Sequence, residues 1–235
     1  MTERTGDPGA QPRRPIVVPA AGDSPAMLDL ARYQALAVLA EEQFGQFTAS
    51  QAEGAGAGAA DIEALLDAQL AERVIGFAEV YRIRAGARHQ HPWLLAAWLS
   101  LDPARPLRDR SLPGGVACRA SAAELYQDGG RGVRAEFIVP GGLSHPVQDV
   151  VIYDEPIGRD DWTRIEGLPV TGIGRTLCDE AIGWDPGNVE SLALSMIRRT
   201  SRDRVLRDLH RYLSGLPEPT RWQQKLPAFV AGLAE

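Results

Sequence analysis

The first third of the chain has a pattern of apolar positions that predicts three helices. Apolar residues recur at helical spacing over residues 25–43 and predict the first helix. Thr48 and Gln51 have the spacing of an N-cap and its capping-box partner, so a short helix is predicted to begin there and to end in the glycines of residues 54–58. One continuous apolar stripe predicts a third helix over residues 59–71.

The segment after these helices has the pattern of an extended ribbon. Residues 73–84 read RVIGFAEVYRIR, with β-branched and aromatic residues on both sides of Gly76, which is typical of two paired strands. Helix, short helix, glycine turn, helix and hairpin, in this order, are the plan of a winged helix-turn-helix. We therefore expect such a domain over residues 26–88, preceded by a flexible tail over residues 1–25 that lacks apolar periodicity.

The rest of the chain, residues 89–235, is predicted to be one mixed α/β domain that ends in helices. The predicted strands cover residues 116–118, 135–139, 148–153, 162–165 and 169–171, the last two joined as a hairpin. The predicted helices cover residues 91–101, 121–126, 174–182, 188–200, 202–214 and 222–234. The predicted fold class is therefore α+β, an N-terminal winged helix-turn-helix followed by this domain.

Composition excludes several classes of protein. The formal net charge of −6, from 25 basic and 31 acidic residues, argues against coating of nucleic acid by bulk charge. All basic residues except Lys225 are arginine, a bias typical of a GC-rich genome, so the placement of arginines is more informative than their number. No apolar run approaches the length of a membrane span, and Cys118 and Cys178 are expected to be reduced and buried. A cytoplasmic protein without membrane contact, metal or cofactor is expected.

Five short segments form an ordered set over residues 28–200. FTASQAEGAG and RVIGFAEVYRI lie in the predicted winged helix, and VACRASAAELY and EFIVP lie in the second region. LPVTGIGRTLCDEA follows, with Arg175, Thr176 and Asp179. This set resembles the AbiEi family of antitoxins from bacterial toxin–antitoxin and abortive-infection systems. The resemblance implies a winged helix that binds operator DNA, an antitoxin domain, and a cognate nucleotidyltransferase-type toxin as partner. Apart from the resemblance, homodimer contacts are expected in the second region.

The predicted recognition helix departs from this pattern because it is acidic. Residues 49–80 contain six acidic residues against one base. Two alternatives follow: the domain contacts DNA mainly through its wing, or it binds protein instead and sequesters the toxin by direct contact. The candidate DNA contacts are Ser50, Gln51, Gln69, Arg73, Arg82, Arg84 and Arg88.

A second group of arginines lies near the C-terminus. Its members are predicted to bind an anionic partner, and they are Arg198, Arg202, Arg204, Arg207 and Arg211. Three of them, at positions 204, 207 and 211, share one helical face, which is either a solvated surface paired with Asp203 and Asp208 or a surface that contacts phosphate or acidic protein. Arg175, Thr176 and Asp179 are interpreted as a structural motif.

Catalytic interpretations are disfavoured. Ser144 and His145 are adjacent without a nucleophile-elbow motif, and the carboxylates at 154–155 and 160–161 are predicted to lie in solvated loops. His89 and His91 are expected to be polar loop residues rather than metal ligands. The sequence therefore favours a non-catalytic antitoxin and autoregulator, with the sequestering protein as its alternative and a small hydrolase or nuclease as a remote third.

Overall fold

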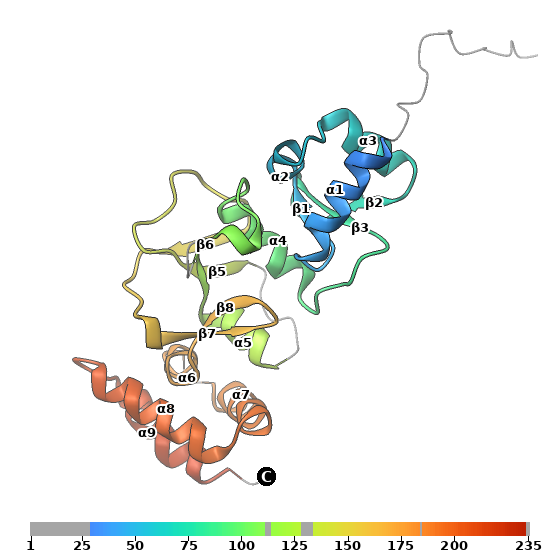
Figure 1. The fold of residues 1–235 in the computed structure, drawn as a ribbon. Helices are drawn as coiled ribbons and strands as arrows, with labels where there is room; N and C mark the ends of the chain where they lie inside the picture. The colour runs from blue at the N-terminus through green and yellow to red at the C-terminus, as the bar shows by residue number, and fades with distance from the viewer. Residues whose placement is uncertain (1–28, 111–113, 128–133, 184, 234–235) are drawn as a thin grey trace, which may run out of the picture.

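The computed structural model describes residues 29–110, 114–127, 134–183 and 185–233, so the tail predicted over residues 1–25 lies outside it. The fold is α+β, with a three-stranded antiparallel sheet, a five-stranded mixed sheet and helices at the C-terminal end (Figure 1). This confirms the predicted fold class. Within the described ranges, no helix combines the length and the apolar character that a membrane crossing requires.

The winged helix forms one end of the molecule (Figure 1). Its elements are α1 (Leu30–Glu41), β1 (Gln46–Thr48), α2 (Ala49–Gly54), α3 (Ala59–Asp67), β2 (Ala71–Arg73) and β3 (Val80–Ile83). The strand order is β1-β3-β2, and the core between sheet and helices buries Leu36, Phe47, Ile62, Leu65 and Tyr81. The wing is the β2–β3 hairpin predicted from the sequence, whereas the three-residue strand β1 was not predicted because it is too short to show a period.

The boundaries of the predicted helices are close to the observed ones. Thr48 caps α2 as predicted: its hydroxyl accepts from the Gln51 backbone N–H at 3.1 Å, and the Gln51 side chain accepts from the Thr48 N–H at 3.1 Å. The third helix ends at Asp67, four residues earlier than predicted. Gln69 has a positive φ of 58°, a left-handed conformation that stops the helix before the strand begins.

Helix α4 (Pro92–Leu101) packs against β1 and β3 and so covers the second face of the small sheet. Trp98 is fully buried there, and its indole N–H donates to the Gly115 carbonyl at 2.8 Å. The helix end is closed by Arg110, whose guanidinium donates to the carbonyls of Trp98, Leu99 and Asp102 at 2.6–2.7 Å. These carbonyls are among those that a helix terminus leaves without intrahelical partners.

The five-stranded sheet occupies the middle of the molecule, in the order β6-β5-β4-β8-β7. Its strands are β4 (Val116–Ala117), β5 (Ala135–Ile138), β6 (Val150–Tyr153), β7 (Trp162–Ile165) and β8 (Leu168–Thr171). The predicted hairpin is β7–β8, which turns at Glu166 and Gly167. β4 is parallel to β8 and β5 is parallel to β6, while the other two pairs are antiparallel.

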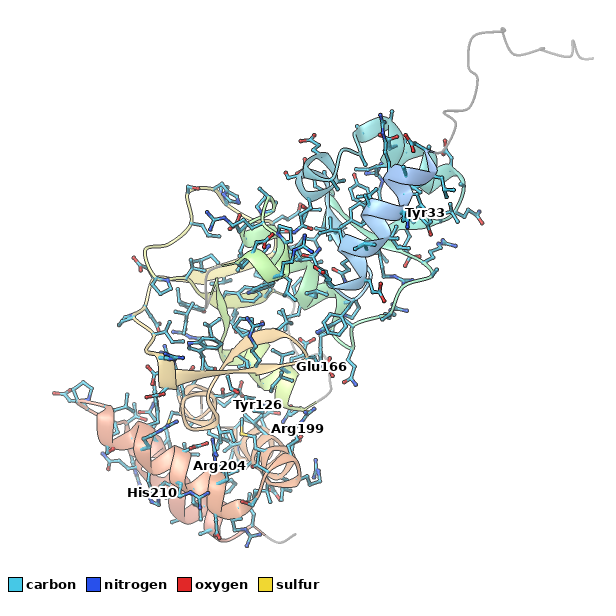
Figure 2. All side chains as sticks on the ribbon, viewed as in Figure 1. Tyr33, Tyr126, Glu166, Arg199, Arg204 and His210 are labelled. Atoms are coloured by element: carbon cyan, nitrogen blue, oxygen red, sulfur yellow. The ribbon has the colours of Figure 1, made fainter. Side chains whose placement is uncertain are left out.

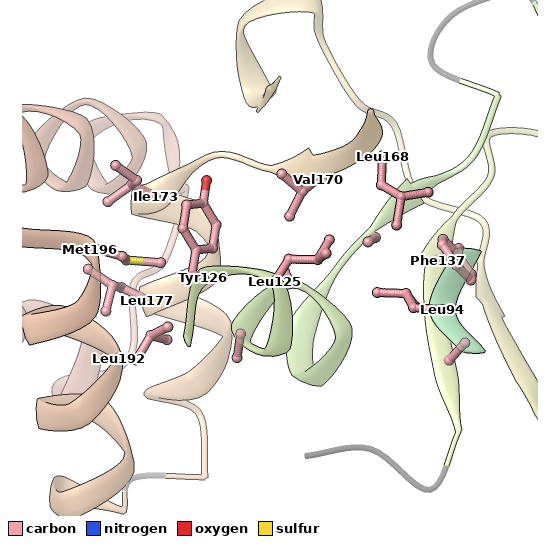
Figure 3. Close-up of a cluster of buried hydrophobic side chains, with 14 of the residues drawn as sticks. Leu94, Leu125, Tyr126, Phe137, Leu168, Val170, Ile173, Leu177, Leu192 and Met196 are labelled. Carbon is pink, nitrogen blue, oxygen red and sulfur yellow. The ribbon is translucent and has the colours of Figure 1, made fainter. Parts of the chain in front are cut away.

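The remaining helices pack beside this sheet. They are α5 (Arg119–Gln127), α6 (Ile173–Glu180), α7 (Pro186–Arg199), α8 (Arg202–Gly215) and α9 (Arg221–Ala231); two short 3-10 turns lie at Leu107–Asp109 and Arg159–Asp161. Figure 3 shows α5 placing Leu125 and Tyr126 between strand residues such as Val170 and helix residues such as Met196. The same core takes in Phe77 and Val80 from the wing, so it reaches from the small sheet to the C-terminal helices.

Helices α6 and α8 approach each other closely at Gly174. A Cβ atom added there would lie 2.3 Å from the Asp208 carbonyl oxygen and 2.9 Å from the Tyr212 Cβ. Real Cβ atoms do not come that near to backbone, so only glycine allows this packing.

Candidate functional site

The predicted recognition helix α3 exposes a surface without basic side chains. Its solvent-facing positions are alanines together with Glu63 and Asp67. Asp61 turns back to accept the Gly58 N–H at 2.9 Å and pairs with Arg32 of α1 at 2.9 Å. A helix that reads the major groove needs donors such as Arg, Lys, Asn or Gln on this face.

The arginines of the wing are paired with glutamates. Arg73 lies 2.5 Å from Glu63, Arg82 lies 2.9 Å from Glu72, and Arg84 lies 3.3 Å from the other oxygen of Glu72. The antiparallel register explains the second pair, since Glu72 of β2 stands directly opposite Arg82 of β3. Arg82 is also the least exposed of the three, with 14% of its side chain accessible. These pairs reduce the positive potential that the wing can offer to phosphate.

The other four candidate DNA contacts are placed differently from one another. Arg88 is exposed and forms no ion pair with any described residue. Gln69 is exposed but lies in the turn after α3 rather than on it, and Ser50 is half-buried at the start of α2. Gln51 is only 3% exposed, so in this fold it faces the interior and not a DNA surface.

The buried position of Gln51 belongs to a hydrogen-bonded group that we call the glutamine network, formed by Gln43, Gln46 and Gln51. Gln51 donates to the Arg105 carbonyl at 2.9 Å, and Gln43 accepts from the Leu107 N–H at 2.8 Å. Within the network, Gln43 donates to the Gln51 side chain at 2.9 Å and to the Gln46 carbonyl at 3.0 Å, and Gln46 donates to the Pro92 carbonyl at 2.7 Å. The network therefore joins the winged helix to α4 and to the loop that follows it.

The Arg175–Thr176–Asp179 motif lies on α6 and is nearly buried. Arg175 pairs with Glu155, which also pairs with Arg119 at 2.9 Å. Arg175 Nε lies 3.9 Å from Asp179 Oδ2, and neither atom has a hydrogen-bond partner within the described residues. Burial raises the pKa of Asp179 to about 6, and the positive charges of Arg175 and Arg119 offset only part of that rise.

Arg119, which shares Glu155 with this motif, leads on to further charged and aromatic groups. Arg119 lies 3.6 Å above the Tyr153 ring, and the Tyr153 hydroxyl donates to Glu136 at 2.8 Å. Thr176 is buried and bonds the Thr171 hydroxyl at 2.8 Å. The carboxylates at 154–155 lie in the loop after β6, as predicted, but Glu155 is only partly exposed and is shared by Arg119 of α5 and Arg175 of α6.

The two histidines expected in a polar loop are also buried, at 2% and 6% exposure. His89 Nε2 lies 3.0 Å from the Glu166 carbonyl, and its ring meets Phe44 edge-on. Burial lowers the pKa of His89, which keeps it neutral near pH 7. His91 Nδ1 lies 3.2 Å from Glu124. Cys118 and Cys178 are free and buried as predicted, and burial raises the pKa of both thiols.

Some arginines of the second group bond other parts of the fold, and others are exposed without an ion pair within the described residues. Arg202 donates to the Leu233 carbonyl at 2.6 Å, tying α8 to the chain end. Arg204 and Arg211 share Asp208 at 2.9 and 3.8 Å, while 58% and 60% of their side chains stay accessible. Arg198 and Arg207 are exposed and form no ion pair within the described residues. Figure 2 shows Arg204 and His210 on α8, at the end of the molecule opposite the winged helix.

Comparison with solved structures finds a likeness to the RV2827C protein from Mycobacterium tuberculosis, known from a crystal structure. The superposition has a TM-score of 0.50 and covers 86% of this chain and 78% of that chain, at 16% sequence identity. At this identity the likeness shows that the folds are similar. No protein-family model matches the chain, and no curated protein sequence matches it significantly.

Proposed function

We propose that the chain is the non-catalytic antitoxin of a toxin–antitoxin pair, and that its winged helix contacts the toxin protein rather than DNA. The observation that carries this proposal is the charge arrangement of the winged helix. Three wing arginines are held by Glu63 and Glu72, and the exposed face of α3 carries only alanine and acidic side chains. Such a surface repels phosphate and suits a partner with a basic face.

One further observation supports an antitoxin. The ordered motifs that resemble the AbiEi family include Arg175, Thr176 and Asp179, and these three lie together on one helix that packs into the second region of the chain. The expected toxin is of the nucleotidyltransferase type, as the motif resemblance implies.

Operator binding remains the second candidate function because the fold itself is a winged helix. Arg88 is exposed without an ion pair to any described residue, and rearrangement of the pairs with Glu63 and Glu72 would add Arg73, Arg82 and Arg84. Three to four phosphate contacts would give weak binding that falls steeply with salt. Autoregulation of the antitoxin gene would then depend on these arginines rather than on α3.

The deciding experiment combines co-purification with the protein encoded by the adjacent gene and a charge reversal on α3. Asp67 is exposed and has no ion-pair partner within the described residues, so Asp67→Lys changes the surface without uncovering a buried charge. We expect Asp67→Lys to weaken toxin binding about tenfold. Glu190→Lys, an equally exposed reversal on α7, is the matched control and should retain binding.

A mobility shift with the gene's own upstream DNA completes the test. We expect no preference over random duplex at moderate salt. A specific shift that Arg84→Ala plus Arg88→Ala abolishes would replace the protein-binding proposal with operator binding. Failure of the adjacent gene product to co-purify with the wild-type chain would remove the antitoxin proposal, and co-purification that Asp67→Lys leaves unchanged would remove the role of α3.

A further inference from the structure

Helix α1 carries apolar residues on its exposed side as well as on its buried side. The buried side packs Leu36, Leu39 and Ala40 into the core of the winged helix. On the other side, Leu30 is 72% exposed and Val38 is 54% exposed, and they are two of the four exposed large hydrophobic side chains in the described part of the chain. Helices that are apolar all round are normally buried all round, so the exposed side of α1 is expected to be covered by a partner.

The exposed apolar residues of α1 form one continuous surface. Leu30, Gln34 and Val38 are spaced by four residues and therefore follow one another along one side of the helix. Two exposed alanines lie beside this row, and their small side chains let another helix approach closely. We call this surface the α1 stripe, which consists of Leu30, Ala31, Gln34, Ala35 and Val38.

The α1 stripe is separate from the exposed face of α3. Arg32 is two positions before Gln34, which turns it to another side of the helix, and there it pairs with Asp61 of α3 at 2.9 Å. The stripe therefore has no charged side chain between Leu30 and Val38. Such a neutral surface suits an apolar partner, in contrast to the basic face that suits α3.

We propose that the α1 stripe is an interface between two copies of the chain, whose α1 helices pack antiparallel about a two-fold axis at Gln34. The stripe is symmetric about this residue, because Leu30 is four residues before it and Val38 is four residues after it. Antiparallel packing places Leu30 of each copy on Val38 of the other. It also joins the two Gln34 amides, each of which offers donors and an acceptor and forms no hydrogen bond within the described residues.

Glu41 supports the antiparallel direction. It is exposed and has no ion pair with a described residue. Seven residues after the axis, it would lie beside the amino end of α1 of the other copy, where the helix dipole favours a carboxylate. Asp29, the N-cap at that end, is paired with Arg32 at 3.3 Å, which reduces its repulsion of Glu41. A parallel pair would instead bring the two Glu41 carboxylates together.

The interface is small because each copy contributes one helix. Helix α1 has 12 residues and is therefore about 18 Å long. The buried area thus falls short of the about 800 Å² per partner that is typical of stable complexes, and we expect a dimer with a dissociation constant of about 10–100 μM. This interface lies on the winged helix and not in the second region, where homodimer contacts were expected from the sequence.

Sedimentation equilibrium of the full chain, at about 1 to 300 μM, measures this dimer. Val38→Asp should raise the dissociation constant at least about tenfold, because it places a charge against Leu30 of the other copy. Ile75→Asp is the matched control, since Ile75 is a still more exposed side chain of the winged helix outside the stripe, and it should leave the constant within about twofold. A full chain that is monomeric throughout this range, or equal effects of the two variants, would overturn the proposal.

Disulfide cross-linking tests the axis and the direction without relying on a charged variant. Gln34→Cys should form a covalent dimer when a mild oxidant is added, since the two positions meet at the axis. Leu30→Cys and Val38→Cys should each fail to cross-link alone, because equivalent positions lie about 12 Å apart, whereas a mixture of the two variants should cross-link. The native thiols of Cys118 and Cys178 are buried and should add no background. Cross-linking of Leu30→Cys or Val38→Cys alone, without that of Gln34→Cys, would overturn the antiparallel dimer.

Other occupants of the α1 stripe give different results. If the toxin covered it, the full chain would stay monomeric and Val38→Asp would weaken co-purification of the adjacent gene product. If residues 1–28 covered it, the chain would dimerise only after their removal. Either result would overturn the proposal. Failure of toxin or DNA binding would leave it standing, because neither partner enters the sedimentation or cross-linking measurement.

Discussion

The two ends of the molecule differ in charge and in how their arginines are used. Residues 29–91, with the winged helix, contain nine acidic and five basic residues, whereas residues 185–233, with α7 to α9, contain five acidic and eight basic ones. In the winged helix, the wing arginines of β2 and β3 are paired with glutamates. On α8, Arg207 has no such partner and Arg204 and Arg211 share a single aspartate.

Backbone geometry accounts for the contrast. Antiparallel pairing places Glu72 opposite Arg82, and Arg84, two residues further and just past the end of β3, reaches the same carboxylate. On α8 the helical repeat turns Arg204, Arg207 and Arg211 to one side, where Asp208 is the only carboxylate that reaches them among the described residues. Local arginine counts therefore indicate available positive charge poorly, and the register of the elements decides it.

The largest expected effect concerns the packing that holds the basic end together. Gly174→Ala places a methyl group 2.3 Å from the Asp208 carbonyl oxygen, so α8 must move away from α6. We expect the free energy of unfolding to fall by about 4 kcal/mol, measured by urea denaturation. Gly183→Ala, where nothing lies within 4 Å, is the control and should change it by less than about 1 kcal/mol. Equal values for both would show that the close helix approach is not required.

The next effect concerns the end of α4 and the loop that follows it, which connect the winged helix to the rest of the fold. Arg110→Ala removes a buried guanidinium from three carbonyls at the end of α4 and should cost about 3 kcal/mol of unfolding free energy. Arg108→Ala breaks only exposed pairs with Glu42 and Asp109 and should cost less than about 1 kcal/mol. Thermal denaturation of both variants measures the difference. A loss of unfolding free energy in Arg110→Ala no larger than in Arg108→Ala would mean that the loop after α4 does not hold the winged helix in place.

A pH effect is expected from Asp179. Its pKa is raised to about 6 in the folded chain, above its ordinary value, so the folded state binds the proton more strongly than the unfolded state. Protonation of Asp179 therefore adds to the free energy of unfolding at low pH. This contribution is lost as the pH rises through 6, and about 1 kcal/mol of it is lost between pH 5 and pH 7. The difference in unfolding free energy between the wild type and Asp179→Asn should change by that amount over this range. A difference independent of pH would show that Asp179 is ionised throughout.

The smallest effect tests the contrast between the ends directly. Glu72→Gln releases Arg82 and Arg84, so binding to heparin or duplex DNA at low salt should tighten by about threefold, with a steeper salt dependence. Arg207→Ala should weaken the binding of the wild-type chain by a similar factor, because its side chain is free. Fluorescence anisotropy with a labelled duplex measures both. If Arg84→Ala weakened binding to the duplex and Arg207→Ala did not, the winged helix rather than α8 would be the end that offers positive charge to nucleic acid.

The sequence predicted local features well and long-range pairing poorly. The capping box of Thr48 and Gln51 depends on residues three apart, and the β7–β8 hairpin depends on a two-residue turn, so both could be recognised. The same Gln51 was expected on a DNA surface, because its bond to the Arg105 carbonyl spans 54 positions and leaves no local signal. The ion pairs of Glu155 and the burial of His89 were not predicted for the same reason, since their partners lie 20 to 77 positions away.

The glutamine network has a consequence for how the protein can be divided. A fragment that ends at Arg88 would keep the three helices and the wing, but the Gln43, Gln46 and Gln51 side chains would lose the Arg105 carbonyl, the Leu107 N–H and the Pro92 carbonyl. Phe77 and Val80 would also lose the α4 core that covers them. The boundary that looks natural in the sequence is thus a poor place to cut. Evolution could exchange such a winged helix between proteins only together with α4 and the loop that follows it.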